Sequence, residues 1–364
     1  LAPGMPGQGE GEPQDTGSRS RARRQEVGVH RGLEPQYEPA VVPKGDKEET
    51  ADPNMATSSE MIGSPAAWSV GYTGAGTRVA VIDTGIDTDH QSFSAAGLEY
   101  SLSLQASEAN MSTEDYLAEL DLLDAEEIAE KVELLNIAPI LKEKGFSAED
   151  LYFNTKIGFG FNYVDKSLDI THDNDAMGEH GSHVEGISAA NAYIPQEDGT
   201  FLNAYEKIKM QGVAPDAQII TMKVFGKAGG AYVSDYMAAI EDAIVLGCDS
   251  VNLSLGSGNP GTSRTDNEVY AAVMENLVNS DTVVTMSAGN SGHWAEHTVH
   301  KGLYDDGISF DEAGSPGSYT NSLSVASVNN SGYVGSFVTV GDHMILYTER
   351  SYVNRPIATI AGDQ

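Results

Sequence analysis

The feature that most restricts the fold is a series of short apolar segments that alternate with amphipathic ones between about residues 156 and 328. The apolar segments have the length of buried strands, and the amphipathic ones repeat apolar residues at helical spacing. Such an alternation predicts an α/β domain with a mostly parallel sheet flanked by helices on both faces. We expect helices at 233–246 and 267–278, and strands at 79–82, 156–164, 218–224, 250–255, 282–287 and 323–328.

Charge and composition exclude several classes of partner. The chain has 54 acidic against 21 basic residues, a formal net charge of −33, whereas nucleic acids and anionic membrane surfaces bind basic proteins. No segment is apolar over the length that membrane insertion requires. The single cysteine, Cys248, cannot form an intrachain disulfide, and its apolar neighbours predict a buried structural thiol.

Composition divides the chain into three expected parts. Residues 1–55 are rich in Pro, Gly, Gln and Glu, which predicts a disordered linker or the remnant of a pro-region with a basic processing site at 19–24. The folded domain is expected at 56–333, with an acidic helical insertion on its surface at about 95–155 that includes a helix start at Ser112 or Thr113. Further short strands at 334–364 predict the start of an inserted domain. No signal peptide is visible, and because the chain begins with Leu1 we expect a fragment or a mature form.

Three reactive groups lie at expected strand ends or helix starts, and such groups collect at the carboxyl edge of a parallel sheet. Asp83 follows the first strand, where we expect it to be half buried and to fix the tautomer of an imidazole. His180, followed by a glycine at a helix start, is suited to moving protons near neutral pH. Asn290, in Ser287-Ala-Gly-Asn290, has an amide that can donate to an oxyanion.

Each group taken singly has a plainer explanation. Asp83-Thr-Gly and Asn290 are both typical of turns. Asp-Thr-Gly also occurs in aspartic proteases, but the only second copy here, Asp15-Thr-Gly17, lies in the tail that we expect to be disordered. His180 and His183 have the spacing of a metal pair, but no third zinc ligand stands nearby, so His183 is expected to be packed or to support the site residues from behind.

No residue is assigned to a metal, and no cofactor is expected to be required. The acidic run from Asp169 to Asp175 is expected to be a solvated loop, with a bound cation as the alternative, because a complete calcium-loop pattern is lacking. Calcium that adds stability is compatible with this sequence.

Together, Asp83, His180 and Asn290 stand in an order that resembles the subtilisin-like (subtilase, peptidase S8) family. The segment 71–87 is similar to the family's aspartate block, and His180-Gly-Ser-His-Val to its histidine block. Gly212-Val-Ala-Pro215 and 251–256 are similar to segments of the core strands that follow. The resemblance covers about residues 60–330 and implies a subtilisin-like serine endopeptidase that hydrolyses peptide bonds in proteins with a Ser-His-Asp triad.

The resemblance also implies a role for particular residues. Asp83 orients His180, His180 acts as general base and then as acid, and Asn290 donates to the oxyanion. Two backbone segments are expected to flank an extended substrate peptide as added strands: Ser254-Leu255-Gly256 and Gly229-Gly230. Glu185 stands where the family has a small residue, and the pattern assigns it no role.

The nucleophile that the resemblance requires is missing from these 364 residues. The family's Gly-Thr-Ser-Met-Ala block does not occur, Gly261-Thr-Ser263 precedes Asn290 rather than following it, and Ser351 has no glycine turn. Large cell-envelope relatives, similar to C5a peptidases and lactocepins, carry a protease-associated domain inserted at the position of residues 334–364. We therefore expect a fold that is incomplete at its C-terminus, an inactive fragment, and a serine in a longer parent. The alternative is a non-catalytic peptide-binding domain that has lost its serine.

The resemblance extends to location and partners. It implies a monomer that is secreted or held at the cell wall of a bacterium, with protein or peptide substrates. The sequence does not define which peptides are cleaved.

Overall fold

A parallel sheet forms the centre of the molecule. The computed structural model describes residues 54–173, 175–256, 268–289, 314, 316–319, 322–328, 337–340 and 343–346. Within them, six strands form a sheet of order β2-β5-β1-β6-β7-β8 in which every neighbouring pair is parallel. The strands are β1 (Arg78–Asp83), β2 (Ile157–Asn162), β5 (Gln218–Lys223), β6 (Ser250–Leu253), β7 (Val283–Ser287) and β8 (Leu323–Val325). The prediction of a mostly parallel α/β fold is confirmed.

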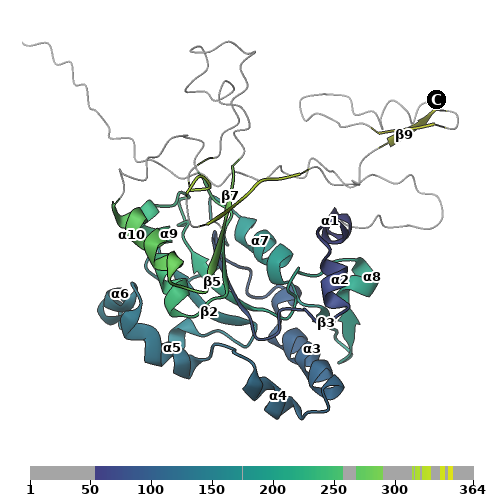
Figure 1. Cartoon of the computed structure of the whole chain (residues 1–364), viewed down its shortest axis with the longest axis horizontal. Coiled ribbons are helices and arrows are strands. Elements are labelled where there is room, and N and C mark those ends of the chain that lie inside the picture. The colour runs from purple at the N-terminus through teal and green to yellow at the C-terminus, as the bar shows by residue number, and fades with distance from the viewer. Residues whose placement is uncertain are drawn as a thin grey trace, which may run out of the picture.

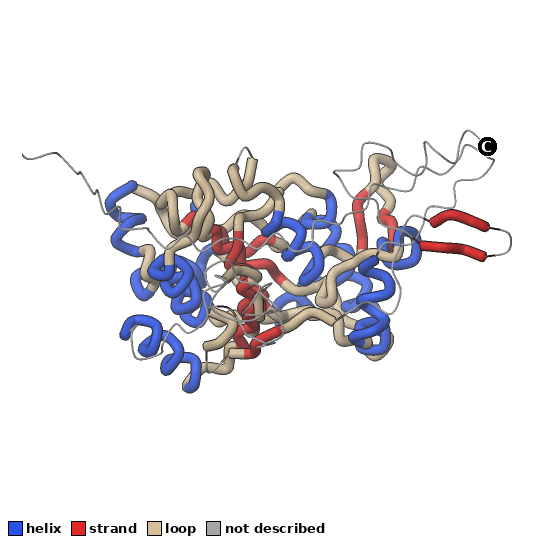
Figure 2. Tube along the Cα trace, turned by 90° about the horizontal axis from the view of Figure 1, so that it is seen from above, coloured by secondary structure: helices blue, strands red, loops and turns tan. Residues whose placement is uncertain are grey.

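Helices cover both faces of this sheet (Figures 1 and 2). On one face, α9 (Val233–Val245) and α10 (Glu268–Val278) pack against Ala80 and Ile82 of β1 and their neighbours in one large buried cluster. On the other face, α7 (His180–Ala189) and η1 (Gln91–Phe93) contribute to a smaller buried cluster with Ile219 of β5. Because alternate residues of a strand point to opposite faces, a strand covered on both sides is buried almost throughout, as β1 and β5 are, and the centre of β1 is apolar.

The acidic segment folds into short helices, as expected. They are α3 (Ala95–Glu108), α4 (Thr113–Glu119), α5 (Ala125–Lys131), η2 (Val132–Leu134), α6 (Ala138–Lys144) and η3 (Glu149–Leu151). The Ser112 side chain caps α4 by accepting a hydrogen bond from the Asp115 amide at 3.1 Å, which confirms the predicted helix start. The segment is more than a surface addition, because several of its apolar side chains lie in the main core: Leu123, Ile128, Leu135, Ile137, Leu141 and Leu151.

This acidic segment is attached at the amino ends of the strands. Arg78, the first residue of β1, is 1% exposed and bonds to Asp121 at 2.6 Å and to Glu127 at 2.7 Å. Gln218, the first residue of β5, exchanges hydrogen bonds of 2.8 and 2.9 Å with the backbone of Leu123. In Figure 1, α4 and α5 lie below the sheet as drawn.

The remaining elements lie outside the large sheet. They are α1 (Asn54–Ile62), α2 (Ser64–Trp68), β3 (Tyr193–Pro195), β4 (Phe201–Asn203), α8 (Ala204–Ile208), β9 (Phe337–Val340) and β10 (His343–Leu346). β9 and β10 form an antiparallel pair of their own, at two of the strands expected in the tail. The third, at 357–360, and residues 1–53 lie outside the described residues. In the described part of the chain, no helix has both the length and the apolar character needed to cross a membrane.

Cys248 is buried, as predicted for a structural thiol. Burial raises the pKa of its thiol to about 12, so the reactive thiolate is disfavoured.

Candidate active site

Asp83 and His180 meet at the carboxyl edge of the sheet. Asp83 is the last residue of β1, and His180 is the first residue of α7, 97 positions later in the chain. Oδ1 of Asp83 lies 2.8 Å from Nδ1 of His180. Strand and helix thus place an acid and an imidazole in contact at the edge where ligands of such sheets bind.

The Asp83 carboxylate is held on one side only. Its Oδ1 also accepts a hydrogen bond from the Thr84 amide at 2.7 Å. The residue is 1% exposed, so the expectation of a half-buried carboxylate was wrong. The reason is that α7 folds over the end of β1, which the sequence around Asp83 does not reveal.

Thr84 fastens the start of α7 to the end of β1. Its Oγ1 donates to the Gly178 carbonyl at 3.0 Å and accepts from the Gly181 amide at 2.8 Å. One of the free amides at the helix N-terminus is thereby satisfied. The threonine of Asp83-Thr-Gly therefore positions the histidine that the aspartate contacts.

Two glycines permit this close approach of strand end and helix. A Cβ on Gly181 would lie 2.2 Å from the Gly85 carbonyl oxygen, and a Cβ on Gly85 would lie 2.2 Å from that of Ile170. Gly85 also has φ of +108°, a conformation that L side chains rarely adopt. The glycines after Asp83-Thr and after His180 are thus required by backbone packing.

The contact with Asp83 fixes the ring of His180. Its side chain is 20% exposed, and burial lowers its pKa, but the hydrogen bond and charge of Asp83 raise it more, so that the pKa stands above its ordinary value of 6.5. Asp83 accepts at Nδ1, which leaves the lone pair of the neutral ring on Nε2. No described residue hydrogen bonds to Nε2. This nitrogen is therefore free to accept a proton.

A second histidine contact was not predicted. Nε2 of His172 lies 2.7 Å from Oγ of Ser182, which also accepts from the Asp87 amide at 2.7 Å. The Ser182 hydroxyl thus links His172 to the backbone at Asp87. His183 is exposed, so the expectation that it is packed was wrong.

The two expected substrate-binding segments lie at the same edge of the sheet. Ser254, Leu255 and Gly256 directly follow β6, and the Leu255 carbonyl accepts from the Ser287 hydroxyl at 3.1 Å. Gly229 and Gly230 follow β5 with φ of +78° and +87°. A Cβ on Gly229 would lie 3.2 Å from Sδ of Met177, so this turn touches the segment before His180.

Asn290 lies outside the described residues. The chain that leads to it is described. Ala288 donates to the Val325 carbonyl at 2.8 Å, and Gly289 has φ of +93°. This segment leaves β7 at the carboxyl edge, where Asp83 and His180 lie.

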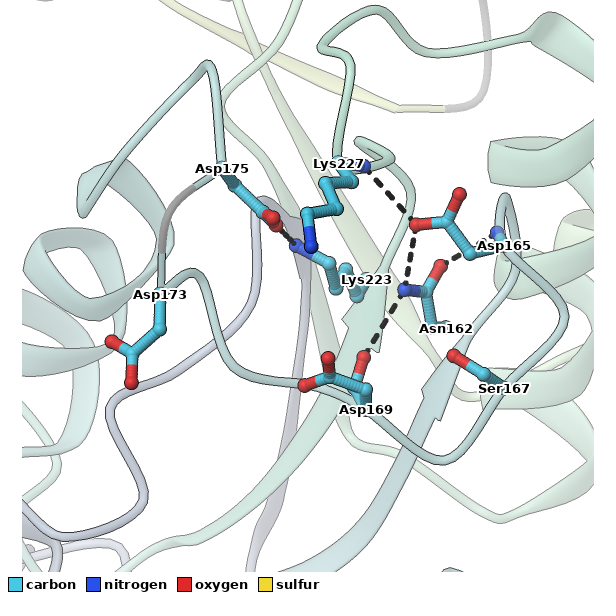
Figure 3. Close-up of a pocket in the computed structure, with 8 residues that line it drawn as sticks. All are labelled: Asn162, Asp165, Ser167, Asp169, Asp173, Asp175, Lys223 and Lys227. Atoms are coloured by element: carbon cyan, nitrogen blue, oxygen red, sulfur yellow. Dashed lines mark hydrogen bonds and ion pairs between the residues drawn. The ribbon is translucent and has the colours of Figure 1, made fainter.

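An acidic pocket of about 190 Å³ lies beyond the ends of β2 and β5 (Figure 3). Oδ2 of Asp165 accepts from Nδ2 of Asn162 and from the Lys227 amide, both at 3.1 Å, and Asp175 is paired with Lys223. No group of three or more His, Cys, Asp or Glu is placed to hold a metal ion in the part of the chain that the structure describes. Two lysines, Lys223 and Lys227, also line this pocket and oppose the binding of a cation. The lining residues are Asn162, Asp165, Ser167, Asp169, Asp173, Asp175, Lys223 and Lys227.

Comparison with known proteins agrees with the geometry. The Subtilase family (peptidase S8) model matches residues 74–354. The PI-type proteinase of Lactococcus lactis subsp. cremoris is 32% identical over 297 residues, 80% of this chain and 13% of that protein. The minor extracellular protease Vpr of Bacillus subtilis is 27% identical over 252 residues, 67% of this chain and 21% of Vpr. Subtilisin NAT of Bacillus subtilis subsp. natto is 26% identical over 283 residues, 78% of this chain and 49% of that protein.

Proposed function

Because the chain belongs to the subtilase family, we propose that it forms most of the catalytic domain of a serine endopeptidase that hydrolyses peptide bonds in proteins. The relatives named above are proteases, and the observation that carries the proposal is the 2.8 Å contact between Asp83 and His180 at the carboxyl edge of the sheet. A buried carboxylate on Nδ1 and an accessible Nε2 are what a Ser-His-Asp triad requires of its acid and its base.

The proposed reaction follows from this arrangement. His180 Nε2 takes the proton of a serine hydroxyl while the oxygen attacks the substrate carbonyl, and the ring then passes the proton to the leaving amine. Asp83 holds the tautomer and stabilises the imidazolium. Asn290 is proposed to donate to the oxyanion, a role whose loss typically costs a factor of about 10²–10³ in rate.

We propose that the nucleophile is a serine in a Gly-Thr-Ser block outside these 364 residues. Ser182, two residues after His180, is not the proposed nucleophile, because its hydroxyl is hydrogen bonded to the Asp87 amide and to His172. The antiparallel pair β9–β10, which is separate from the six-stranded sheet, supports an inserted domain that begins near residue 334.

The substrate is proposed to bind as an extended peptide between two backbone segments, 229–230 and 254–256. Both leave the carboxyl ends of strands beside β1, so a peptide between them would cross in front of His180. The protein is proposed to be secreted or held at the cell surface, as the name of the extracellular protease Vpr suggests.

A fluorophosphonate probe tests the proposal on the longest reading frame that contains this chain. We expect the probe to label one serine in a Gly-Thr-Ser block, and His180→Ala to slow labelling by about 10³-fold or more. Ser182→Ala is the matched control and should keep labelling. A longer protein that lacks the block, or that folds and is not labelled, would support the non-catalytic peptide-binding domain instead.

A further inference from the structure

Three buried polar side chains, one of them the aspartate of the Asp83–His180 pair, gather between β1, β5 and α7. They are Asp83 of β1, Thr221 of β5 and Glu185 of α7, and each is 1% exposed. Val81 pairs with Thr221 and Asp83 with Lys223, so Thr221 lies one step back from the edge on the strand next to Asp83. Side chains two residues apart on a strand share a face, so Thr221 points to the same side as Lys223. Glu185, on the helix that covers this side, reaches down to it.

In the carboxyl groups of Asp83 and Glu185, one oxygen accepts hydrogen bonds and the other has no hydrogen-bond partner among the described residues. Oε1 of Glu185 accepts from Thr221 Oγ1 at 2.8 Å. Oδ1 of Asp83 accepts from both Thr84 and His180. Both Oε2 of Glu185 and Oδ2 of Asp83 are fully buried, and neither has a hydrogen-bond partner among the described residues. Buried polar atoms of this kind are rare in folded proteins and call for an explanation.

The two groups differ in what stabilises a negative charge. Asp83 has the imidazole of His180 and a backbone amide, whereas Glu185 has only the hydroxyl of Thr221. Lys223, the residue of β5 that pairs with Asp83, carries a positive charge, but its ammonium group is bound to Asp175 and to the Thr84 carbonyl. Burial raises the pKa of Glu185 well above its ordinary value of 4.5, the Thr221 hydrogen bond lowers it, and the charge of Asp83 raises it further. Burial and the neighbouring charge of Asp83 thus both favour the neutral, protonated form of Glu185.

We propose that Glu185 is a positioning residue for the Asp83–His180 pair: its protonated carboxyl presents a hydrogen to Oδ2 of Asp83, through a small side-chain adjustment or one bridging water. The donor and the acceptor are the two spare oxygens on the same covered face of the sheet. Glu185 follows His180 on α7 by five positions, about one and a half turns, so one helix holds both contacts of the aspartate. The inference rests on the proposed function for the role of His180 as base.

The hydrogen bond has a predictable effect on the histidine. A donor at Oδ2 withdraws charge from the Asp83 carboxylate and so limits how strongly it stabilises the imidazolium form of His180. Without that donor, His180 would hold its proton to higher pH and less of it would be the neutral base. Glu185 thus sets the pH range in which the pair is ready to accept a proton.

An NMR titration of His180 in the 364-residue chain tests this without any nucleophile. Glu185→Gln keeps the shape and the donor, and should leave the His180 midpoint unchanged. Glu185→Met has a similar length but no donor, and should raise the midpoint by about 0.5–1 unit, a three- to tenfold gain in proton affinity. If both variants lower the midpoint, Glu185 is ionised; if neither moves it, Glu185 only fills space. Both results overturn the proposal.

Infrared difference spectroscopy gives a second readout should the Met variant not fold. At about pH 8, the wild type should show the carbonyl band of a protonated carboxylic acid that is lost in Glu185→Gln. A wild type without this band contradicts the proposal. Neither measurement involves fluorophosphonate labelling. A negative result for the proposed peptidase function can therefore be distinguished from a negative result for the role of Glu185.

Discussion

At Asp83, two hydrogen bonds converge on one oxygen of a carboxylate that has almost no contact with solvent. The Thr84 amide holds the carboxylate in place, and the carboxylate in turn holds the ring of His180. Because the aspartate is buried, its charge is weakly screened and acts strongly on the imidazole. The pKa of His180 is raised for this reason, despite the burial of the ring.

Asp83→Asn should lower the pKa of His180, because the charge and the charge-assisted hydrogen bond are both lost. A group whose pKa is raised by folding contributes stability below its unfolded pKa and loses it as the pH rises through the folded value. The free energy of unfolding that wild type gains from this pair should therefore be larger at about pH 5 than at about pH 9. Urea titrations of both proteins at the two pH values measure this. If the free energies of unfolding of wild type and Asp83→Asn differ by the same amount at both pH values, the pair is not coupled to protonation.

At the scale of elements, α7 depends on backbone contact with the end of β1. Gly181 faces Gly85, whereas Gly186, on the same helix, has open space at the position of a Cβ. The two glycines therefore provide a matched comparison of tight packing and helix propensity within one element.

Gly181→Ala should destabilise the protein by about 3 kcal/mol or more, because the methyl group would displace the backbone at Gly85. Gly186→Ala should stabilise it by up to about 1 kcal/mol, since alanine is the better helix former. Thermal and urea unfolding distinguish the two. Equal effects would mean that α7 does not lie against the end of β1 as described.

The acidic helical segment depends on Arg78 in a comparable way. The guanidinium is buried and also donates to the Leu246 carbonyl at 2.6 Å, while Asp121 at its other end is 79% exposed. Arg78→Met should cost about 3–5 kcal/mol, because it leaves buried acceptors without their donor. Asp121→Ala should cost less than about 1 kcal/mol, as exposed ion pairs do. Urea midpoints of the two variants check the contrast; similar losses would argue against Arg78 as the anchor.

At the scale of the whole molecule, most of the fold could be predicted because its strands are apolar runs of sufficient length. Asp83 and His180 could be predicted because each stands in a short motif next to a strand or helix end. The burial of Asp83 and the solvent exposure of His183 could not, since both depend on how α7 lies on the sheet. The contact of Glu185 with Thr221 spans 36 positions and has no local signal.

The two ends of the strands contact different parts of the molecule. The strands end at Asp83 and the proposed cleft, and they begin at Arg78 and Gln218, where the acidic helices are fastened. Because Leu123, Ile128 and Leu135 of this segment also lie in the main core, changes confined to its exposed charged side chains should disturb the carboxyl end of the sheet least, provided that the two anchors are kept. A protein engineer therefore has a site for a label or tether on the exposed side of these helices, at the opposite end of the strands from Asp83 and His180.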